Sequence, residues 1–302
     1  MKPIIATLTL LLISCDFSSP IEIETGFKNV NGTSLYYEVI GNGEPIIIVH
    51  GGPGLNHTYL QEGLSTLAND YQLIFYDQRV CGQSTKEVDT TAITMKNFVE
   101  DIEALRKAFK IEKINLMAHS WGGLLAMHYA IRYPDHLKSL MLINSVGANN
   151  EIDAKANEIL SQRFTGEDIE KQNQIYQSEA FKNREIKSIE SLMKIGFKHQ
   201  FYNPSYVDSL SLSLNEDYMQ TSKLLRYLGN DLSTYNLEEA LKAVKVPTLL
   251  VYGTHDPLTA FAGKQLNGLI PTSRFEKLEK SGHFPFIEQS DQFKRLIIEF
   301  LK

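Results

Sequence analysis

The sequence predicts an α/β fold, with a mostly parallel, doubly wound sheet of eight strands and an inserted helical cap. Apolar runs alternate with helix-like segments through the first half of the chain and again near its end, which is the order of parallel βαβ units. Between residues 147 and 244 the strand-like runs stop, and the chain becomes polar and helical. A helical block that interrupts one α/β pattern indicates a cap inserted into a single core.

The expected strands are apolar runs bounded by turn residues. Asn31-Gly32, between the first two, is a strong hairpin signal, and the unbroken run Ile46–Val49 is typical of a strand buried on both faces. The expected strands are Phe27–Val30, Leu35–Ile40, Pro45–His50, Leu73–Asp77, Ile114–Ala118, Leu140–Ser145, Pro247–Tyr252 and Ser273–Leu278. The expected helices are Met95–Phe109, Leu124–Arg132 and Asp291–Leu301 in the core and Ala154–Gln162, Arg184–Phe197 and Glu216–Leu228 in the cap. We therefore expect a core of residues 21–146 and 245–302 and a cap of residues 147–244.

The composition is that of a globular protein with an acidic balance. Hydrophobic residues make up 43% of the 302 residues, enough for a large buried core, and the formal net charge is −6. Lys and Arg form no cluster of the kind that binds nucleic acid, so we expect no nucleic-acid partner. The His and Cys residues are not spaced like metal ligands, and we expect neither a metal nor an organic cofactor.

The N-terminal residues predict a targeting segment outside the fold. Lys2 precedes the apolar run Ile4–Ile13, which is shorter than the ~18–20 residues of a membrane-spanning helix, so a signal peptide is expected over residues 1–14. Its end, Leu12-Ile13-Ser14-Cys15, resembles the lipobox of bacterial lipoproteins. We expect lipidation of Cys15, a tether over residues 15–20, and a place in the bacterial cell envelope with the lipid anchor as the sole membrane attachment. A plain secretory signal with an incidental cysteine is the alternative.

Ala118-His119-Ser120-Trp121-Gly122-Gly123 is the sharpest local motif. It follows an expected strand and opens an expected helix, the setting in which a strained turn exposes a nucleophilic serine. Small residues are required around that turn; Gly122 fits, and Ala118 stands where glycine is usual but remains small. A serine also occurs at helix starts for structural reasons alone.

The loop His50-Gly51-Gly52-Pro53-Gly54 ends a buried strand upstream of this serine. In such a fold that loop supplies one backbone N–H of the oxyanion hole, and the residue after the nucleophile supplies the other. We therefore expect Gly52, or alternatively Gly51, and Trp121 as the donors. Glycines let the backbone approach a substrate closely, so Gly51 is also a candidate substrate-binding residue.

Two further loops carry candidate partners of Ser120 in the chain order nucleophile, acid, histidine. Asp256 follows the expected strand Pro247–Tyr252, and His283 follows the last expected strand. We expect His283 to take the serine proton and later to protonate the leaving group, while Asp256 holds the imidazole and stabilises its charged form. The predicted catalytic residues are Ser120, Asp256 and His283.

Together these residues resemble the prolyl iminopeptidase family, a branch of the α/β hydrolases. The loop His50–Gly54, the turn Ser120–Gly123 and the segment Asp77–Ser84 are similar to hallmark motifs of that family, although Val80 replaces a glycine in the last of them. The resemblance covers the core on both sides of the cap. It implies an α/β-hydrolase fold and removal of an N-terminal residue, often proline, from short peptides, with the Asp77 segment bracing loops at the mouth of the site.

The resemblance also implies an anchor for the free α-ammonium group of the peptide, which family members hold with cap carboxylates. Asn215-Glu216 resembles the cap motif of archaeal-type members, so Glu216 is the expected amine anchor. A glutamate at a helix start is also favoured by the helix dipole without any role in binding.

Three functions are compatible with these motifs. The first is a serine aminopeptidase, and the second is a carboxylesterase or lactonase, because ester and amide hydrolysis share the acyl-enzyme route. The third, from another class, is an inert lipid-anchored binding protein on a hydrolase scaffold. Serine at the nucleophile position excludes dehalogenases that use aspartate there. The expected partner is a short peptide or another small molecule, and the sequence leaves the oligomeric state open.

Overall fold

One eight-stranded sheet organises residues 23–302, which are described by the computed structural model apart from the side chains of residues 153 and 260. The strand order is β1-β2-β4-β3-β5-β6-β7-β8; β1 and β2 are antiparallel, and β4, β3 and β5 to β8 run parallel to one another. The strands are β1 (Ile23–Val30), β2 (Thr33–Ile40), β3 (Glu44–Val49), β4 (Tyr71–Tyr76), β5 (Ile114–His119), β6 (Leu137–Ile143), β7 (Thr248–Gly253) and β8 (Ser273–Leu278). The predicted fold class is confirmed.

The β1–β2 hairpin forms at the predicted turn. Asn31 and Gly32 have φ angles of 45° and 68°, and Val30 pairs with Thr33 across the turn. A two-residue turn of this type needs positive φ at both positions, which asparagine and glycine adopt most readily.

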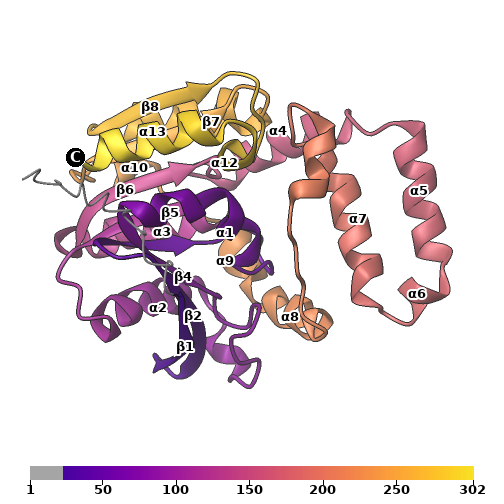
Figure 1. The fold of residues 1–302 in the computed structure, drawn as a ribbon, viewed down its shortest axis with the longest axis horizontal. Coiled ribbons are helices and arrows are strands. Elements are labelled where there is room, and N and C mark those ends of the chain that lie inside the picture. The colour runs from indigo at the N-terminus through magenta and orange to yellow at the C-terminus, as the bar shows by residue number, and fades with distance from the viewer. Residues whose placement is uncertain (1–22) are drawn as a thin grey trace, which may run out of the picture.

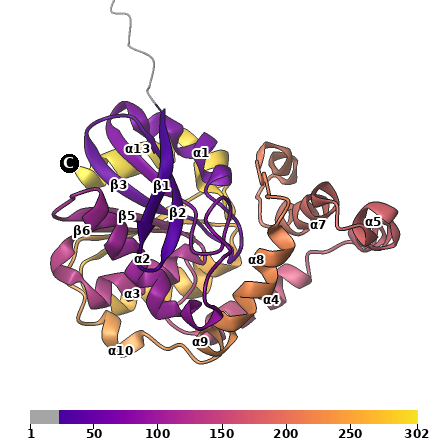
Figure 2. The same cartoon turned by 90° about the horizontal axis from the view of Figure 1, so that it is seen from below.

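Helices cover both faces of the sheet (Figure 2). Along β3, Ile47 and Val49 pack in the core on the side of α2 (Met95–Ala108) and α3 (Gly122–Arg132). Ile46 and Ile48 point the other way, into a second core with residues of α1 (Thr58–Leu64) and α13 (Ser290–Leu301). The apolar run of β3 therefore serves two cores at once, as its unbroken pattern predicts.

The chain between β6 and β7 is helical in the described residues. Its helices are α4 (Asn150–Ser161), α5 (Gly166–Gln177), α6 (Glu179–Lys182), α7 (Ile186–Lys198), α8 (Tyr218–Leu224), α9 (Gly229–Ser233) and α10 (Glu238–Leu241). In Figure 1, α5, α6 and α7 form an arm that stands away from the sheet, whereas α4, α8 and α9 lie closer to it. We refer to residues 147–244 as the cap; this boundary stays a prediction.

The cap helices depart from the expected spans in several places. α4 starts at Asn150, four residues early, because the Asn149 side chain caps it through the N–H of Ile152. The span Glu216–Leu228 was expected to be one helix. It consists instead of a turn at residues 216–217, α8, and a 3₁₀ turn at Leu225–Leu228. The sequence pattern did not single out α5, which begins with a capping box between Thr165 and Asp168.

The predicted signal segment and Cys15 lie outside the described residues. Among residues 23–302, no helix combines the length and the apolar composition that crossing a membrane requires. β7 and β8 are followed by α11 (Lys264–Leu269) and α12 (Pro285–Glu288), respectively, and the loops after β3, β5, β6, β7 and β8 carry the site described below.

Candidate active site

Ser120 occupies the tight turn between β5 and α3. Its φ is 55°, in the left-handed region that non-glycine residues rarely adopt. A Cβ atom on Gly122 would lie 2.6 Å from the backbone oxygens of Val49 and His50, and one on Gly123 would lie 2.0 Å from Oγ of Ser145. The turn therefore requires small residues after the serine, as a strained nucleophile elbow does.

Asp256 and His283 meet on neighbouring loops. Nδ1 of His283 lies 2.6 Å from Oδ2 of Asp256, and the other carboxylate oxygen accepts the Leu258 N–H at 3.0 Å. Burial raises the pKa of Asp256, but the charge and hydrogen bond of His283 outweigh it, and the net pKa lies below its usual value. Asp256 is therefore ionised and holds the ring of His283 with Nε2 left for Ser120. Within the described residues the Ser120 hydroxyl has no hydrogen bond to His283, a contact that commonly tightens only when substrate binds.

Asn144 is a member of this site that the sequence did not indicate. It follows β6, has a φ of 43°, and donates its amide N–H to Oδ2 of Asp256 at 2.6 Å and to the Gly282 carbonyl at 3.2 Å. Asparagine tolerates this φ better than most residues. A polar residue directly after a buried strand that leads to the site was the available signal, and its partner lies 112 residues away.

The two predicted glycine donors are not equivalent. The Gly51 N–H donates to the Tyr59 hydroxyl at 2.7 Å, so it is not available to a substrate. In the described part of the chain, the N–H groups of Gly52 and Trp121 have no such partner, and both residues line the same cavity. The geometry therefore favours Gly52 over Gly51 as the oxyanion donor on this loop.

Tyr59 and His119 form a buried chain of hydrogen bonds beneath Ser120. The His283 carbonyl can only accept, so the neutral ring of His119 carries its proton on Nε2, 2.8 Å away. Nδ1 of His119 then accepts from the Tyr59 hydroxyl, 2.7 Å away, and the Tyr59 oxygen accepts from the Gly51 N–H. Burial holds the pKa of His119 well below its usual value, in agreement with a neutral ring. The chain links the glycine loop to the loop of the catalytic histidine.

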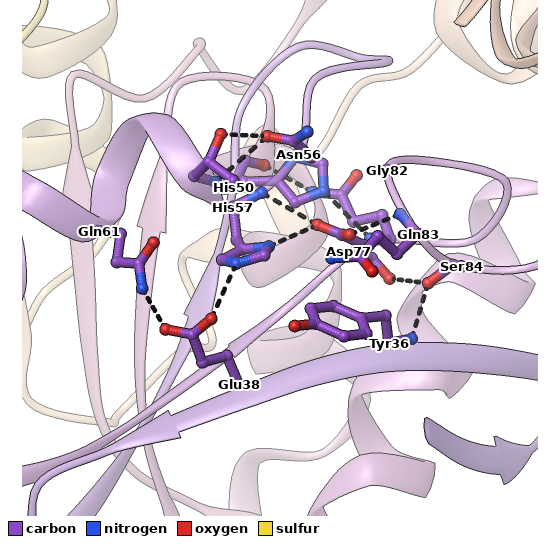
Figure 3. Close-up of polar contacts among 12 residues, drawn as sticks. Tyr36, Glu38, His50, Asn56, His57, Gln61, Asp77, Gly82, Gln83 and Ser84 are labelled. Carbon is purple, nitrogen blue, oxygen red and sulfur yellow. Dashed lines mark hydrogen bonds and ion pairs between the residues drawn. The ribbon is translucent and has the colours of Figure 1, made fainter. Parts of the chain in front are cut away.

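The segment after β4 braces the chain that leads from the glycine loop into α1, as expected. Figure 3 shows His57 between Asp77 and Glu38; its Nδ1 lies 2.8 Å from Asp77 and its Nε2 lies 3.6 Å from Glu38. Asp77 also accepts the backbone N–H groups of His57 and Gln83. Burial opposes the charge on His57, but the two carboxylates raise its pKa to about 9. A positively charged histidine therefore joins the loop after β4, through Asp77, to strand β2, through Glu38.

Ser120, Asp256 and His283 line one cavity of about 640 Å³ between the core and the cap. This volume is in the range of small-molecule sites. Its walls are mostly apolar, and among its described lining residues Asp256 is the one acidic side chain. The lining residues from the cap are Asn150, Ala154, Ala156, Asn157, Leu160, Met193, Phe197, Gln200, Tyr218, Leu232 and Tyr235.

Among the predicted site residues that the structure describes, Glu216 is the one that does not line this cavity. It lies in the turn before α8, is exposed, and is not among the lining residues, although Tyr218 two positions later is.

The described residues contain no cluster of ligands suited to a metal ion.

The alignment with known proteins covers most of the chain. The family model of the α/β hydrolase fold matches residues 44–290. Proline iminopeptidase of Heyndrickxia coagulans is 28% identical over 91% of this chain and 98% of its own length, and that of Saccharolobus solfataricus is 29% identical over 93% of each.

Solved structures show the same fold at lower identity. The proline iminopeptidase of Mycobacterium smegmatis superposes with a TM-score of 0.67 at 20% identity, covering 92% of this chain and 97% of the other. The enol-lactonase of Burkholderia xenovorans LB400 gives a TM-score of 0.62 at 20% identity, over 91% and 99%. On the match over residues 44–290, the chain belongs to the α/β hydrolase fold family.

Proposed function

We propose that the protein is a serine aminopeptidase that releases an N-terminal residue, proline or another, from short peptides through an acyl-enzyme. The observation that carries the proposal is the meeting of Ser120, the ionised Asp256–His283 pair and two unpaired backbone N–H groups in one cavity. The relatives named proline iminopeptidase match over more than nine-tenths of the chain, which supports the peptidase choice.

In the proposed reaction, Nε2 of His283 removes the Ser120 proton as Oγ attacks the substrate carbonyl carbon. The N–H groups of Gly52 and Trp121 stabilise the negative oxygen that develops. His283 then gives its proton to the leaving amine as the C–N bond breaks, and water hydrolyses the acyl-enzyme by the same steps. Asp256 remains ionised throughout and stabilises the imidazolium.

Glu216 remains our proposed anchor for the α-ammonium group of the peptide. Its exposure means that it would act at the edge of the cavity, two residues before Tyr218, which lies against Gly54 of the glycine loop. An exposed ion pair contributes about 0–1 kcal/mol, so Glu216 would select for free amines only modestly in this arrangement.

The apolar lining favours a second candidate, a carboxylesterase or lactonase with the same residues. The cap wall carries Leu160, Met193 and Phe197 and contributes only neutral polar groups such as Asn157 and Gln200. A neutral acyl group fits this wall without a buried countercharge.

Hydrolysis of proline β-naphthylamide, of its N-blocked form and of a short-chain p-nitrophenyl ester separates the candidates. The aminopeptidase predicts cleavage of the free-amine amide only, loss in Ser120→Ala, and a higher KM for the free amine alone in Glu216→Gln. Glu167→Gln, an exposed glutamate on α5, is the matched control. Ester cleavage without any free-amine preference would exclude the peptidase, and failure of a fluorophosphonate to label Ser120 would support the inert scaffold.

We also propose that the protein is anchored to the bacterial envelope through a lipid on Cys15. The support is the sequence Leu12-Ile13-Ser14-Cys15 after a basic start and a short apolar run. Radiolabelled palmitate should enter the wild-type protein in cells and should not enter Cys15→Ala. Labelling that survives in Cys15→Ala would exclude this site of attachment.

A further inference from the structure

Gln78 lies between the two segments that would form the oxyanion hole. It follows β4, is buried, and belongs to neither segment. Its Nε2 lies 2.5 Å from the His50 carbonyl oxygen, at the start of the glycine loop. Its Oε1 lies 3.0 Å from the indole Nε1 of Trp121, the residue after Ser120. One side-chain amide therefore spans from the glycine loop to the nucleophile turn.

The orientation of this amide follows from the chemistry of its partners. An indole N–H can only donate, so it must meet the oxygen of Gln78. A backbone carbonyl can only accept, so it must meet the nitrogen. Both partners are thus satisfied by one orientation alone, and the opposite orientation would lose both hydrogen bonds.

The backbone of Gln78 adds a third contact to the same loop. Its N–H donates to Nε2 of His50 at 3.0 Å, which leaves the proton of the neutral ring on Nδ1, 2.8 Å from the Gly51 carbonyl. Burial lowers the pKa of His50 to about 4, so the ring is neutral near pH 7. The Gly51 carbonyl and the Gly52 N–H share one planar, trans peptide unit and point in opposite directions. Holding the carbonyl against His50 therefore also directs the Gly52 N–H.

We propose that Gln78 is a positioning residue that sets the separation and direction of the two oxyanion-hole donors, the N–H groups of Gly52 and Trp121. It acts on the first through His50 and on the second through the Trp121 indole. The inference rests on the proposed serine hydrolase mechanism and is independent of whether the substrate is a peptide or an ester. A misplacement of about 1 Å in such a site can lower turnover by about 10²-fold.

The first test reads the Gln78–Trp121 contact directly, because Trp121 is the single tryptophan of the chain. In the ¹⁵N-labelled full-length protein, the indole N–H gives one resonance. Gln78→Met, which keeps the side-chain length but has no amide, should move this resonance upfield and speed its exchange with solvent. Gln83→Met makes the same change on an exposed side chain nearby and should leave it unmoved. An unmoved resonance in Gln78→Met would overturn the proposal.

The second test measures turnover per active site, with the sites counted by fluorophosphonate titration, on whichever of proline β-naphthylamide and the p-nitrophenyl ester the wild type cleaves, so that failure of the peptidase assignment does not affect it. Gln78→Met should lower kcat by about 10- to 100-fold with KM within about twofold, since the lost interaction acts in the transition state. A tetrahedral inhibitor such as a boronic acid should lose affinity by a similar factor. If kcat per active site stays within twofold of wild type, Gln78 is only structural and the proposal fails.

Two milder variants keep the proposal testable if Gln78→Met does not fold. Trp121→Phe removes the indole N–H while keeping the backbone donor, and Gln78→Glu keeps an acceptor for the indole but cannot donate to His50 when ionised. Each should lower kcat by several-fold, and the double variant should lose less than the product of the two. Wild-type kcat in both single variants would overturn the proposal.

Discussion

The two walls of the active-site cavity are built in different ways. On the core side, buried side chains on and beside the loops at the ends of the strands are tied to one another by hydrogen bonds such as Asn144–Asp256 and Tyr59–His119. On the cap side, α4 and α7 present apolar side chains to the cavity. Farther out on the arm, Ile169 and Tyr176 of α5 are 52% and 51% exposed. The polar interactions that fix geometry are thus concentrated in the core wall.

The cap is nevertheless attached next to the triad. The Arg163 side chain donates to the carbonyls of His199 and His255, which join the cap to the loop of Asp256. The His283 N–H donates to the Gln200 carbonyl at 2.8 Å. The contrast between the hydrogen-bonded core wall and the apolar cap wall indicates a division of roles. The core wall determines the chemistry, and the cap wall determines which substrates fit.

The largest expected effect lies in the core wall. Ser120→Ala removes the nucleophile and should lower turnover by about 10⁴-fold or more. The melting temperature should change little, because the substitution removes only a hydroxyl group and no packing contact of the core. Hydrolysis of the substrate that the wild type cleaves measures the loss in the purified variant, with Ser161→Ala on the exposed end of α4 as the control. Residual activity above about a tenth of wild type would assign the chemistry to another group.

Asn144→Gly tests whether the core wall depends on its hydrogen bonds. Glycine accepts the positive φ of Asn144 but cannot donate to Asp256. We expect kcat to fall by about 10- to 100-fold, because the carboxylate loses one of the contacts that orient it. Steady-state kinetics per titrated active site provide the measurement. A change in KM alone would instead place Asn144 with the substrate-selecting groups.

Phe197→Ala tests the cap wall. Phe197 lines the cavity from α7 and packs against Phe284 at 5.8 Å between ring centroids. Phe197 is only half-buried, so losing its phenyl group removes about 1 kcal/mol of apolar contact, and KM for an apolar substrate should rise about fivefold while kcat stays within about twofold. Ile169→Ala on the exposed face of α5 is the matched control. An equal loss in kcat would contradict the division of roles.

The smallest expected effect on catalysis comes from the cluster of His57, Asp77 and Glu38. Its contribution is measured as a change in the free energy of unfolding. The pKa of His57 is raised from 6.5 to about 9, so its contribution is fully present below pH 6.5 and is lost as the pH rises through 9. Urea unfolding should show a loss of about 3 kcal/mol between pH 6 and pH 10. The groups that face His57 are Asp77, Glu38 and the neutral His50. In His57→Gln this loss should be absent, and a loss of equal size would rule out His57 as its source.

Local patterns in the sequence were sufficient for the strands and the hairpin. Alternating and continuous apolar runs report burial directly, so the eight strands were predicted to within a few residues. The cap helices were less accurate. Their boundaries depend on caps such as Asn149 and Thr165, which a search for apolar periodicity does not weigh.

The sequence by itself determined the fold class, the helical insertion and the loops on which Ser120, Asp256 and His283 lie, because each depends on residues close together in the chain. Tertiary structure alone decided which groups those loops meet. It engaged the Gly51 N–H with Tyr59, brought Asn144 to Asp256, placed Gln78 between His50 and Trp121, and left Glu216 exposed. These contacts join segments up to 112 residues apart, and hydrogen bonds need particular donors and acceptors at about 3 Å. Only the packing of sheet, helices and cap brings such atoms within that distance.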